Sequence, residues 1–186
     1  ARKRIAFVPP RFGHDLGGGA EALVADLALL LHTAGDCDVE IWTTCARDHR
    51  SWENFYPAGA SVEGGLTVRR FPVDRRDLEK FIGAEIKLAE GRTLSIEEQL
   101  VWLENSVNST GLYRHIAETG DSFDWILFAP YLFATTFWGG LIHPERSVLI
   151  PCLHDEAYAY LPLFSHLAAQ VGRMIFNAEP ELELAH

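Results

Sequence analysis

Short apolar runs alternate along this chain with longer segments of helical character, and no other feature limits the possible folds as strongly. Apolar runs of about four to eight residues are typical of strands buried in a sheet that is covered on both faces. The alternation predicts an α/β fold with a doubly wound, mostly parallel open sheet. We expect residues 1–186 to form a single domain. The predicted strands are 4–8, 39–44, 66–71, 125–128, 148–151 and 174–176.

The segments between these strands are predicted mainly as helices. Residues 20–33 are apolar on almost every side and are followed by Gly35, which indicates a largely buried helix. The segment 77–120 is too long and too polar for one crossover helix, so we expect two or three helices. One of them is expected to begin at a capping box of Ser95 and Glu98. Shorter helices are expected at 132–141 and 158–171, and a long loop at 48–65.

The acidic composition limits the classes of partner. Asp and Glu number 26 against 16 Lys and Arg, which gives a formal net charge of −10, whereas nucleic acids and anionic membranes need a basic surface. The cluster of Arg69, Arg70, Arg75 and Arg76 is predicted as a solvated strand end and loop in preference to an anion site. Cysteines without a C-x-x-C pair favour a reducing compartment. We therefore expect a cytoplasmic protein with no nucleic-acid partner and no integral membrane segment.

A glycine-rich segment follows the first predicted strand. Ligands of doubly wound sheets bind at the carboxyl ends of the strands, and here residues 9–16 lead to Gly17, Gly18 and Gly19. Adjacent glycines let backbone N–H groups approach a ligand closely, and a helix start adds unpaired N–H groups with a positive dipole end. This corner suits phosphate or sugar oxygens. Asp15, just ahead of the glycines, is predicted either to line a ligand pocket or to fold the loop onto itself.

A second polar segment, His154, Asp155 and Glu156, follows the fifth predicted strand. A neutral imidazole at His154 can hydrogen-bond a ligand hydroxyl, and either acid can hold the ring or bind hydroxyls itself. The alternative is structural: Asp155 caps the next helix and His154 is a satisfied strand-end residue. No metal is expected, because the single C-x-H of Cys152 and His154 has no second pair at ligand spacing.

A dinucleotide site is the first alternative, since residues 17–22 formally match G-x-G-x-x-A. Three details count against it. The first glycine does not follow the strand directly, Glu21 places a carboxylate beside the pyrophosphate, and the second strand ends in Thr43 and Thr44 where an acid should hold the ribose.

The order of these motifs resembles a known family, the retaining glycosyltransferases with two Rossmann-like domains (the GT-B architecture), a group that includes sucrose synthases and bacterial mannosyl- and glucosyltransferases. The resemblance covers essentially the whole chain and is to the amino-terminal, acceptor-side domain. The motifs that carry it are Arg4-Ile5-Ala6-Phe7-Val8, Gly17-Gly18-Gly19-Ala20-Glu21, and Val148-Leu149-Ile150-Pro151 running into Leu153-His154-Asp155.

The resemblance implies an enzyme that transfers a sugar from a nucleotide-diphosphate donor to an acceptor hydroxyl with retention, without a cofactor or an obligatory metal. It implies that the glycine loop approaches the donor diphosphate or the acceptor, and that His154 lies near the transferred sugar. We accordingly expect His154 and Asp155 as catalytic residues, and substrate contacts from Asp15, Gly17, Gly18, Gly19, Glu21 and Glu156.

The chain departs from the family pattern in one respect. The family places its basic donor-phosphate residues and an E-x7-E pair in a second domain, whereas Glu90 and Glu98 have this spacing only within the polar helical segment. We therefore expect a fragment whose donor-binding domain is missing and which has no transferase activity by itself. Two other classes stay open: a complete small nucleotide- or dinucleotide-dependent enzyme, and a non-catalytic α/β module that binds a partner.

Overall fold

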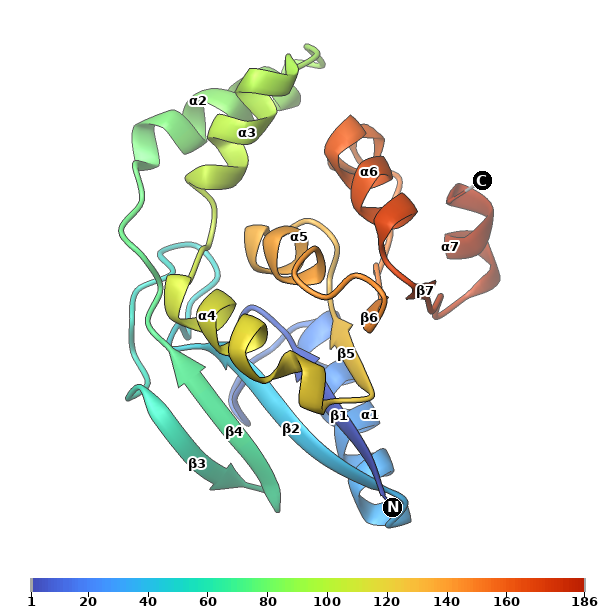
Figure 1. Cartoon of the computed structure of the whole chain (residues 1–186). Coiled ribbons are helices and arrows are strands. Elements are labelled where there is room, and N and C mark those ends of the chain that lie inside the picture. Colours follow the sequence, from blue (N-terminus) through green and yellow to red (C-terminus); the bar gives the residue numbers. More distant parts are fainter. Residues whose placement is uncertain (1, 186) are drawn as a thin grey trace.

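A computed structural model describes residues 2–185, and these residues form one seven-stranded sheet with helices packed on it (Figure 1). The strands are β1 (Lys3–Val8), β2 (Cys37–Thr44), β3 (Gly59–Glu63), β4 (Leu66–Phe71), β5 (Trp125–Phe128), β6 (Ser147–Leu149) and β7 (Arg173–Met174). The helices are α1 (Gly19–Ala34), α2 (Leu78–Ala89), α3 (Ile96–Glu104), α4 (Thr110–Thr119), α5 (Ala134–Gly140), α6 (Pro162–Gln170) and α7 (Glu179–Leu184), with 3₁₀ turns η1 (Gly120–Ser122) and η2 (Ala157–Tyr160).

The predicted mostly parallel, doubly wound sheet is confirmed. The strand order is β3-β4-β2-β1-β5-β6-β7, and every neighbouring pair is parallel except β3 with β4. The chain starts in the middle of the sheet, because Phe7 of β1 pairs with Ile41 of β2 on one side and with Leu127 of β5 on the other. The order reverses between β1 and β5, and in sheets of this kind ligands bind at the carboxyl ends of the strands beside such a reversal.

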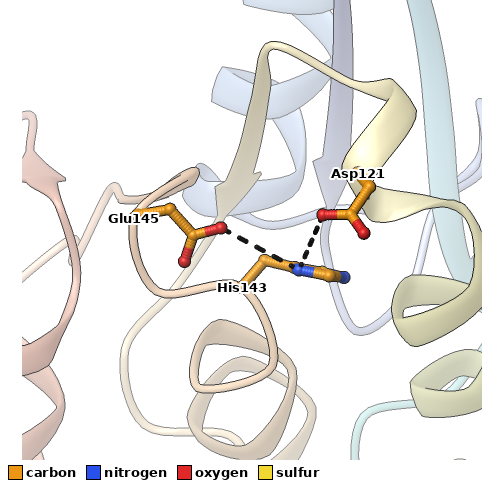
Figure 2. A group of neighbouring side chains, drawn as sticks. All are labelled: Asp121, His143 and Glu145. Carbon is orange, nitrogen blue, oxygen red and sulfur yellow. Dashed lines mark ion pairs between the residues drawn. The ribbon is translucent and has the colours of Figure 1, made fainter.

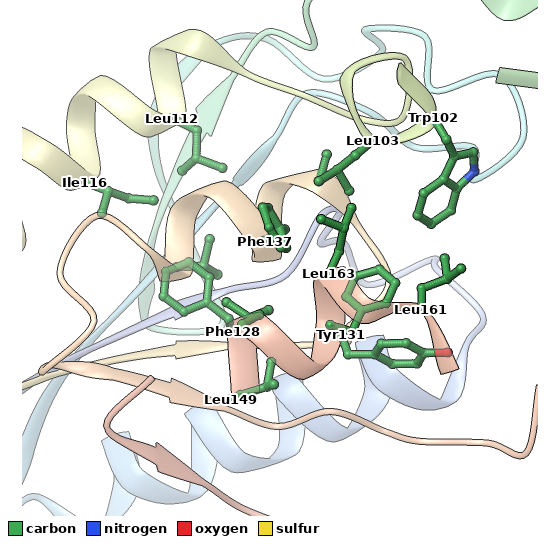
Figure 3. Close-up of a cluster of buried hydrophobic side chains, with 14 of the residues drawn as sticks. Trp102, Leu103, Leu112, Ile116, Phe128, Tyr131, Phe137, Leu149, Leu161 and Leu163 are labelled. Atoms are coloured by element: carbon green, nitrogen blue, oxygen red, sulfur yellow. The ribbon is translucent and has the colours of Figure 1, made fainter. Parts of the chain in front are cut away.

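Helices cover the two faces of the sheet unequally. On one face Val24 of α1 packs in a cluster with Phe7 of β1 and Ile41 of β2. On the other face, α3, α4, α5 and α6 enclose a larger core around Trp102 and Phe128 (Figure 3). Figure 1 shows α2 and α3 side by side as a helical pair that projects beyond the carboxyl end of the sheet. The three helices between residues 77 and 120, and the Ser95–Glu98 capping box, are confirmed.

Strand β3 corrects the prediction of a long loop at 48–65. This strand pairs antiparallel with β4 at the edge of the sheet, and Val62 is 73% exposed. Because neither of its faces is buried, its sequence lacks the alternation that marks a half-buried strand. Gly64 and Gly65, both at positive φ, make the tight turn into β4, and such a pair between two strands is a hairpin signal.

Two helix predictions are also corrected. Helix α1 is not largely buried: Val24 and Ala28 are enclosed, while Leu29 and Leu30 are 45% and 64% exposed, because no second layer covers this side of α1 within the described residues. The expected helix at 158–171 is divided into η2 and α6. Pro162 causes the division, since proline favours the first turn of a helix and disfavours helical conformation in the residue before it.

Candidate functional site

The two predicted polar segments lie at one edge of the sheet. The glycine loop follows β1, the His154 segment follows β6, and β5 lies between these two strands and is parallel to both. Cys152, at the start of the second segment, packs against the hydrophobic cluster around α1. The structure therefore brings the two segments to the same carboxyl edge of the sheet, one on each side of the β1–β5 reversal.

Arg11 holds the glycine loop from inside. Its side chain is largely buried, and its Nε donates to the Oε1 of Glu21 at 2.6 Å. Its Nη1 and Nη2 donate to the backbone carbonyls of Arg47 (2.9 Å) and Gly17 (3.2 Å). One guanidinium thus joins the glycine loop, the first turn of α1 and the loop after β2. The Glu21 carboxylate is neutralised by this ion pair, and it lies over the loop rather than free in solvent.

The backbone N–H groups of the glycine loop are unpaired. From Gly17 to Glu21 no backbone N–H donates to an acceptor within residues 2–185, and the first to do so is that of Ala22, which donates to the Gly18 carbonyl at 3.1 Å. Gly17, Gly18 and Gly19 are exposed, and no side chain caps the helix. Five consecutive N–H groups at the positive end of α1 can therefore bind an anionic or hydroxyl-rich ligand.

Replacing Gly18 with alanine is expected to lower the free energy of unfolding by about 1–3 kcal/mol. Its φ of +153° disfavours any side chain, and an added Cβ would lie 2.1 Å from the Oε2 of Glu21, which Arg11 holds in place. Gly17→Ala is the matched control, because nothing lies within 4 Å of a Cβ there, and its effect should stay below about 0.5 kcal/mol. Urea denaturation measures both, and equal losses would contradict the stated role of Gly18.

Asp15 faces the loop after β2. Its carboxylate accepts a hydrogen bond from the Tyr56 hydroxyl at 2.8 Å and forms an ion pair with Arg47 at 2.7 Å. The bond from Tyr56, together with the charge of Arg47, holds the pKa of Asp15 below its ordinary value. The carboxylate therefore fastens the segment before the glycines onto the neighbouring loop. Of the two roles expected for Asp15, these contacts directly support the folding of the loop onto itself. They do not test ligand binding.

Arg70 corrects the prediction that the arginine cluster is solvated. It is only 5% exposed, and its guanidinium is paired with Glu63, donates to the Phe12 carbonyl at 2.8 Å and lies 4.5 Å from the centre of the Tyr56 ring. Arg69, the next residue, points to the other face and pairs with Glu40 at its partly exposed end. The alternation of a strand places one arginine inside and one outside.

The acids beside His154 bind tyrosines. Asp155 accepts from the Tyr160 hydroxyl at 2.7 Å, and Glu156 accepts from the buried Tyr131 hydroxyl at 2.8 Å. Neither acid contacts the imidazole through a hydrogen bond, and neither caps a helix through its side chain. His154 itself is exposed and has no hydrogen-bond partner among residues 2–185. The helix-cap alternative for Asp155 is therefore wrong, and the ring of His154 is accessible to a ligand.

Glu181 on α7 is a site residue that sequence reasoning missed. It is 8% exposed, and its two carboxylate oxygens each accept one backbone N–H at 2.7 Å, from Leu153 and from Asn177. The same carboxylate adds to the effect of burial in raising the pKa of the Cys152 thiol. Glu181 thus ties the segment after β6 to the segment after β7 and fixes the backbone that precedes His154. Its sequence surroundings contain no motif that marks this role.

One group of three side chains has the composition of a metal site, but it lies away from the glycine loop and His154. Asp121, His143 and Glu145 converge in Figure 2, with the His143 Nδ1 3.4 Å from Asp121 and 4.0 Å from Glu145. Asp121 precedes β5 and Glu145 precedes β6, so the group lies at the opposite edge of the sheet from the glycine loop. The Arg146 guanidinium lies within 3.9 Å of both acids and supplies a positive charge already. We interpret the group as an ion-paired surface cluster.

Comparison with known proteins does not assign the chain to a family. A scan against protein-family models finds no match, and a search of curated proteins finds no similar sequence. Within residues 2–185, no helix has the length and apolar character that crossing a bilayer requires. The edge of the sheet that carries the glycine loop and His154 is therefore the main structural indication of function.

Proposed function

We propose that this chain is the acceptor-side, Rossmann-like domain of a retaining glycosyltransferase of GT-B architecture, which moves a sugar from a nucleotide-diphosphate donor to an acceptor hydroxyl. The observation that carries the proposal is the run of five N–H groups from Gly17 to Glu21 that have no acceptor among residues 2–185, at the carboxyl edge of β1 and beside the reversal of strand order. In this proposal a separate donor-binding domain completes the enzyme, and no metal or cofactor takes part in the transfer.

The chemistry of sugar transfer fits these groups. As the bond to the leaving diphosphate breaks, negative charge grows on its oxygens, and N–H groups that are already fixed in place stabilise this charge without reorganising. Arg11 and the conformation of Gly18 fix the loop before any ligand arrives. The exposed His154 can hydrogen-bond a hydroxyl of the transferred sugar. Glu181 holds the segment that presents it.

The structure supports the dinucleotide alternative less well. Thr43 and Thr44, at the end of β2, are fully buried, and their hydroxyls donate to the carbonyls of Pro9 (2.9 Å) and Pro10 (2.6 Å). These bonds hold the long excursion between β1 and the glycines against β2. The position where an acid would bind the ribose is therefore occupied by contacts within the protein.

The proposal can be tested on the native gene product with a panel of nucleotide-diphosphate sugars. We expect acceptor-dependent release of nucleoside diphosphate, and we expect His154→Ala to lower kcat/KM at least about tenfold, because a hydrogen bond to the reacting sugar is lost. His166→Ala is the matched control, since His166 is also exposed but lies on α6. It should leave the rate unchanged.

A binding measurement tests separately whether the N–H groups from Gly17 to Glu21 contact the nucleotide sugar. In an NMR titration of this chain, nucleotide sugars should shift the amide signals of residues 17–21 with a dissociation constant weaker than about 0.1 mM, because the other half of the donor site is not present in this proposal. Tight binding of NAD, or nucleotide-sugar shifts confined to other residues, would overturn the proposal in favour of a cofactor-dependent enzyme or an unrelated binding module.

A further inference from the structure

An apolar cavity of about 470 Å³ lies behind the segment that carries His154. It is partly open to solvent and is bordered by the end of β6, by α6, by β7 and by α7. Its walls are mainly aliphatic and aromatic, and include Leu153, Phe164, Leu167, Ala168 and Met174. Leu153 directly precedes His154, so one wall of the cavity is part of the candidate site.

The size and mixed lining of this cavity point to a guest that is only partly apolar. Protein interiors are packed about as densely as organic crystals, and few voids larger than a water molecule remain. A volume of about 470 Å³ falls within the range of small-molecule sites, which is roughly 300–1,000 Å³.

Two polar side chains of the cavity wall are hydrogen-bonded to the residues that follow His154. Two tyrosines line it, Tyr131 and Tyr160, and their hydroxyls donate to Glu156 and Asp155, the two residues that follow His154. A molecule whose apolar part fills the cavity would therefore present its polar end to Asp155 and His154. Glu181, which holds the Leu153 backbone, adds a third carboxylate nearby.

Three carboxylates hydrogen-bonded to residues of the cavity wall determine which polar head group the cavity accepts. Asp155, Glu156 and Glu181 would repel a phosphate or carboxylate head group, because these acids have no Lys or Arg partner among the described ion pairs. A neutral hydroxyl avoids this repulsion and can donate to Asp155. We propose that the cavity binds the apolar part of an amphiphilic alcohol, and, resting on the proposed function, that this alcohol is the acceptor whose hydroxyl receives the sugar.

The test uses a reporter that lies within the cavity itself. Met174 is the only methionine of the sequence, so labelling the methionine methyl group with carbon-13 gives an NMR signal from the cavity wall. Octanol is the probe, and glucose, which has hydroxyls but no apolar chain, is the control ligand. We expect octanol to shift the Met174 signal saturably and glucose to leave it unchanged.

Two neighbouring alanines on α6 provide matched variants. Ala168→Phe fills the cavity and should weaken octanol binding at least tenfold, whereas Ala169→Phe, on the exposed side of the same helix, should not change it. If Ala168→Phe fails to fold, Ala159→Leu fills the cavity from η2 instead. A shift that is absent or does not saturate, or an unchanged affinity in the cavity variants, would overturn the proposal.

This result is separable from the transferase activity. Octanol binding is read without any nucleotide sugar, so the cavity assignment can hold when the transferase proposal fails. The opposite outcome is also possible: the native gene product transfers sugar, but octanol does not bind and Ala168→Phe leaves KM for the acceptor unchanged. In that case the transferase proposal stands, and the acceptor is not held in this cavity.

Discussion

Replacing Arg70 with alanine is expected to lower the free energy of unfolding by about 3–5 kcal/mol. The guanidinium is 5% exposed, is paired with Glu63 and donates to the Phe12 carbonyl at 2.8 Å. Its removal leaves a partly buried carboxylate without its counter-charge and a buried carbonyl without a donor, and both losses are costly. Urea denaturation followed by circular dichroism measures the effect.

Arg69→Ala is the matched control for this variant. Arg69 is the adjacent residue of β4, but its ion pair with Glu40 is partly exposed, and such pairs contribute at most about 1 kcal/mol. If the two variants lose equal stability, burial of Arg70 is not the cause. Hydrogen exchange adds a second measurement, because Arg70 holds the Phe12 carbonyl ahead of the glycine loop. The amide of Leu16, which donates to the Gly13 carbonyl at 3.3 Å, should exchange faster in Arg70→Ala only.

The same ion pair predicts a pH dependence. The hydrogen bond from Arg70 holds the pKa of Glu63 below its ordinary value of 4.5. A carboxyl whose pKa is lower in the folded state stabilises the protein above the unfolded pKa, and this contribution is lost as the pH falls through the folded pKa. In Arg70→Ala the pKa of Glu63 should return toward its ordinary value. The acid-dependent loss of stability below about pH 4.5 should therefore be smaller than in the unaltered protein.

The sheet was largely predictable from the sequence because its strands are buried runs. The predicted strands 66–71 and 125–128 coincide with β4 and β5, and those at 4–8 and 39–44 differ from β1 and β2 only at their first residues. Strand β3 was missed because both of its faces are exposed, although Gly64 and Gly65 mark its turn. The spacing of apolar residues in a sequence reflects which side chains are buried. It therefore cannot identify an edge strand that is held mainly by backbone hydrogen bonds.

The site could be predicted only as far as its position. That the two candidate segments follow β1 and β6 is a consequence of the fold class. The partners of these segments were not predictable, because Glu181 contacts Leu153, 28 residues away, and Asp15 contacts Tyr56, 41 residues away. Such contacts leave no spacing pattern in the sequence. Exposure of Leu29 and Leu30 was not predictable either, since an apolar helix does not reveal how many layers cover it.

Replacing Trp102 with alanine is expected to lower the free energy of unfolding by about 3–5 kcal/mol. Trp102 of α3 is 1% exposed and stacks on the Tyr158 ring of η2 at a centroid distance of 5.6 Å, with Phe164 of α6 edge-on at 6.1 Å. Its Nε1 donates to Glu85 of α2 at 2.7 Å, and the Tyr158 hydroxyl donates to the same carboxylate. One indole therefore joins the α2–α3 pair to the segment between His154 and α6.

The position of Trp102 gives this loss a functional readout. Without the indole, Tyr158 and Phe164 lose a packing partner, and Phe164 is a wall of the apolar cavity. We expect Trp102→Ala to weaken octanol binding as well as stability. Trp102→Phe keeps an aromatic ring but loses the bond to Glu85, and its effects should lie between those of the unaltered protein and Trp102→Ala.

Leu100→Ala on the same helix is the control, because Leu100 is 39% exposed and its truncation should cost less than about 1 kcal/mol. If Trp102→Ala unfolds no more readily than Leu100→Ala, then α2 and α3 are held to the sheet by other contacts, and the cavity wall does not depend on them.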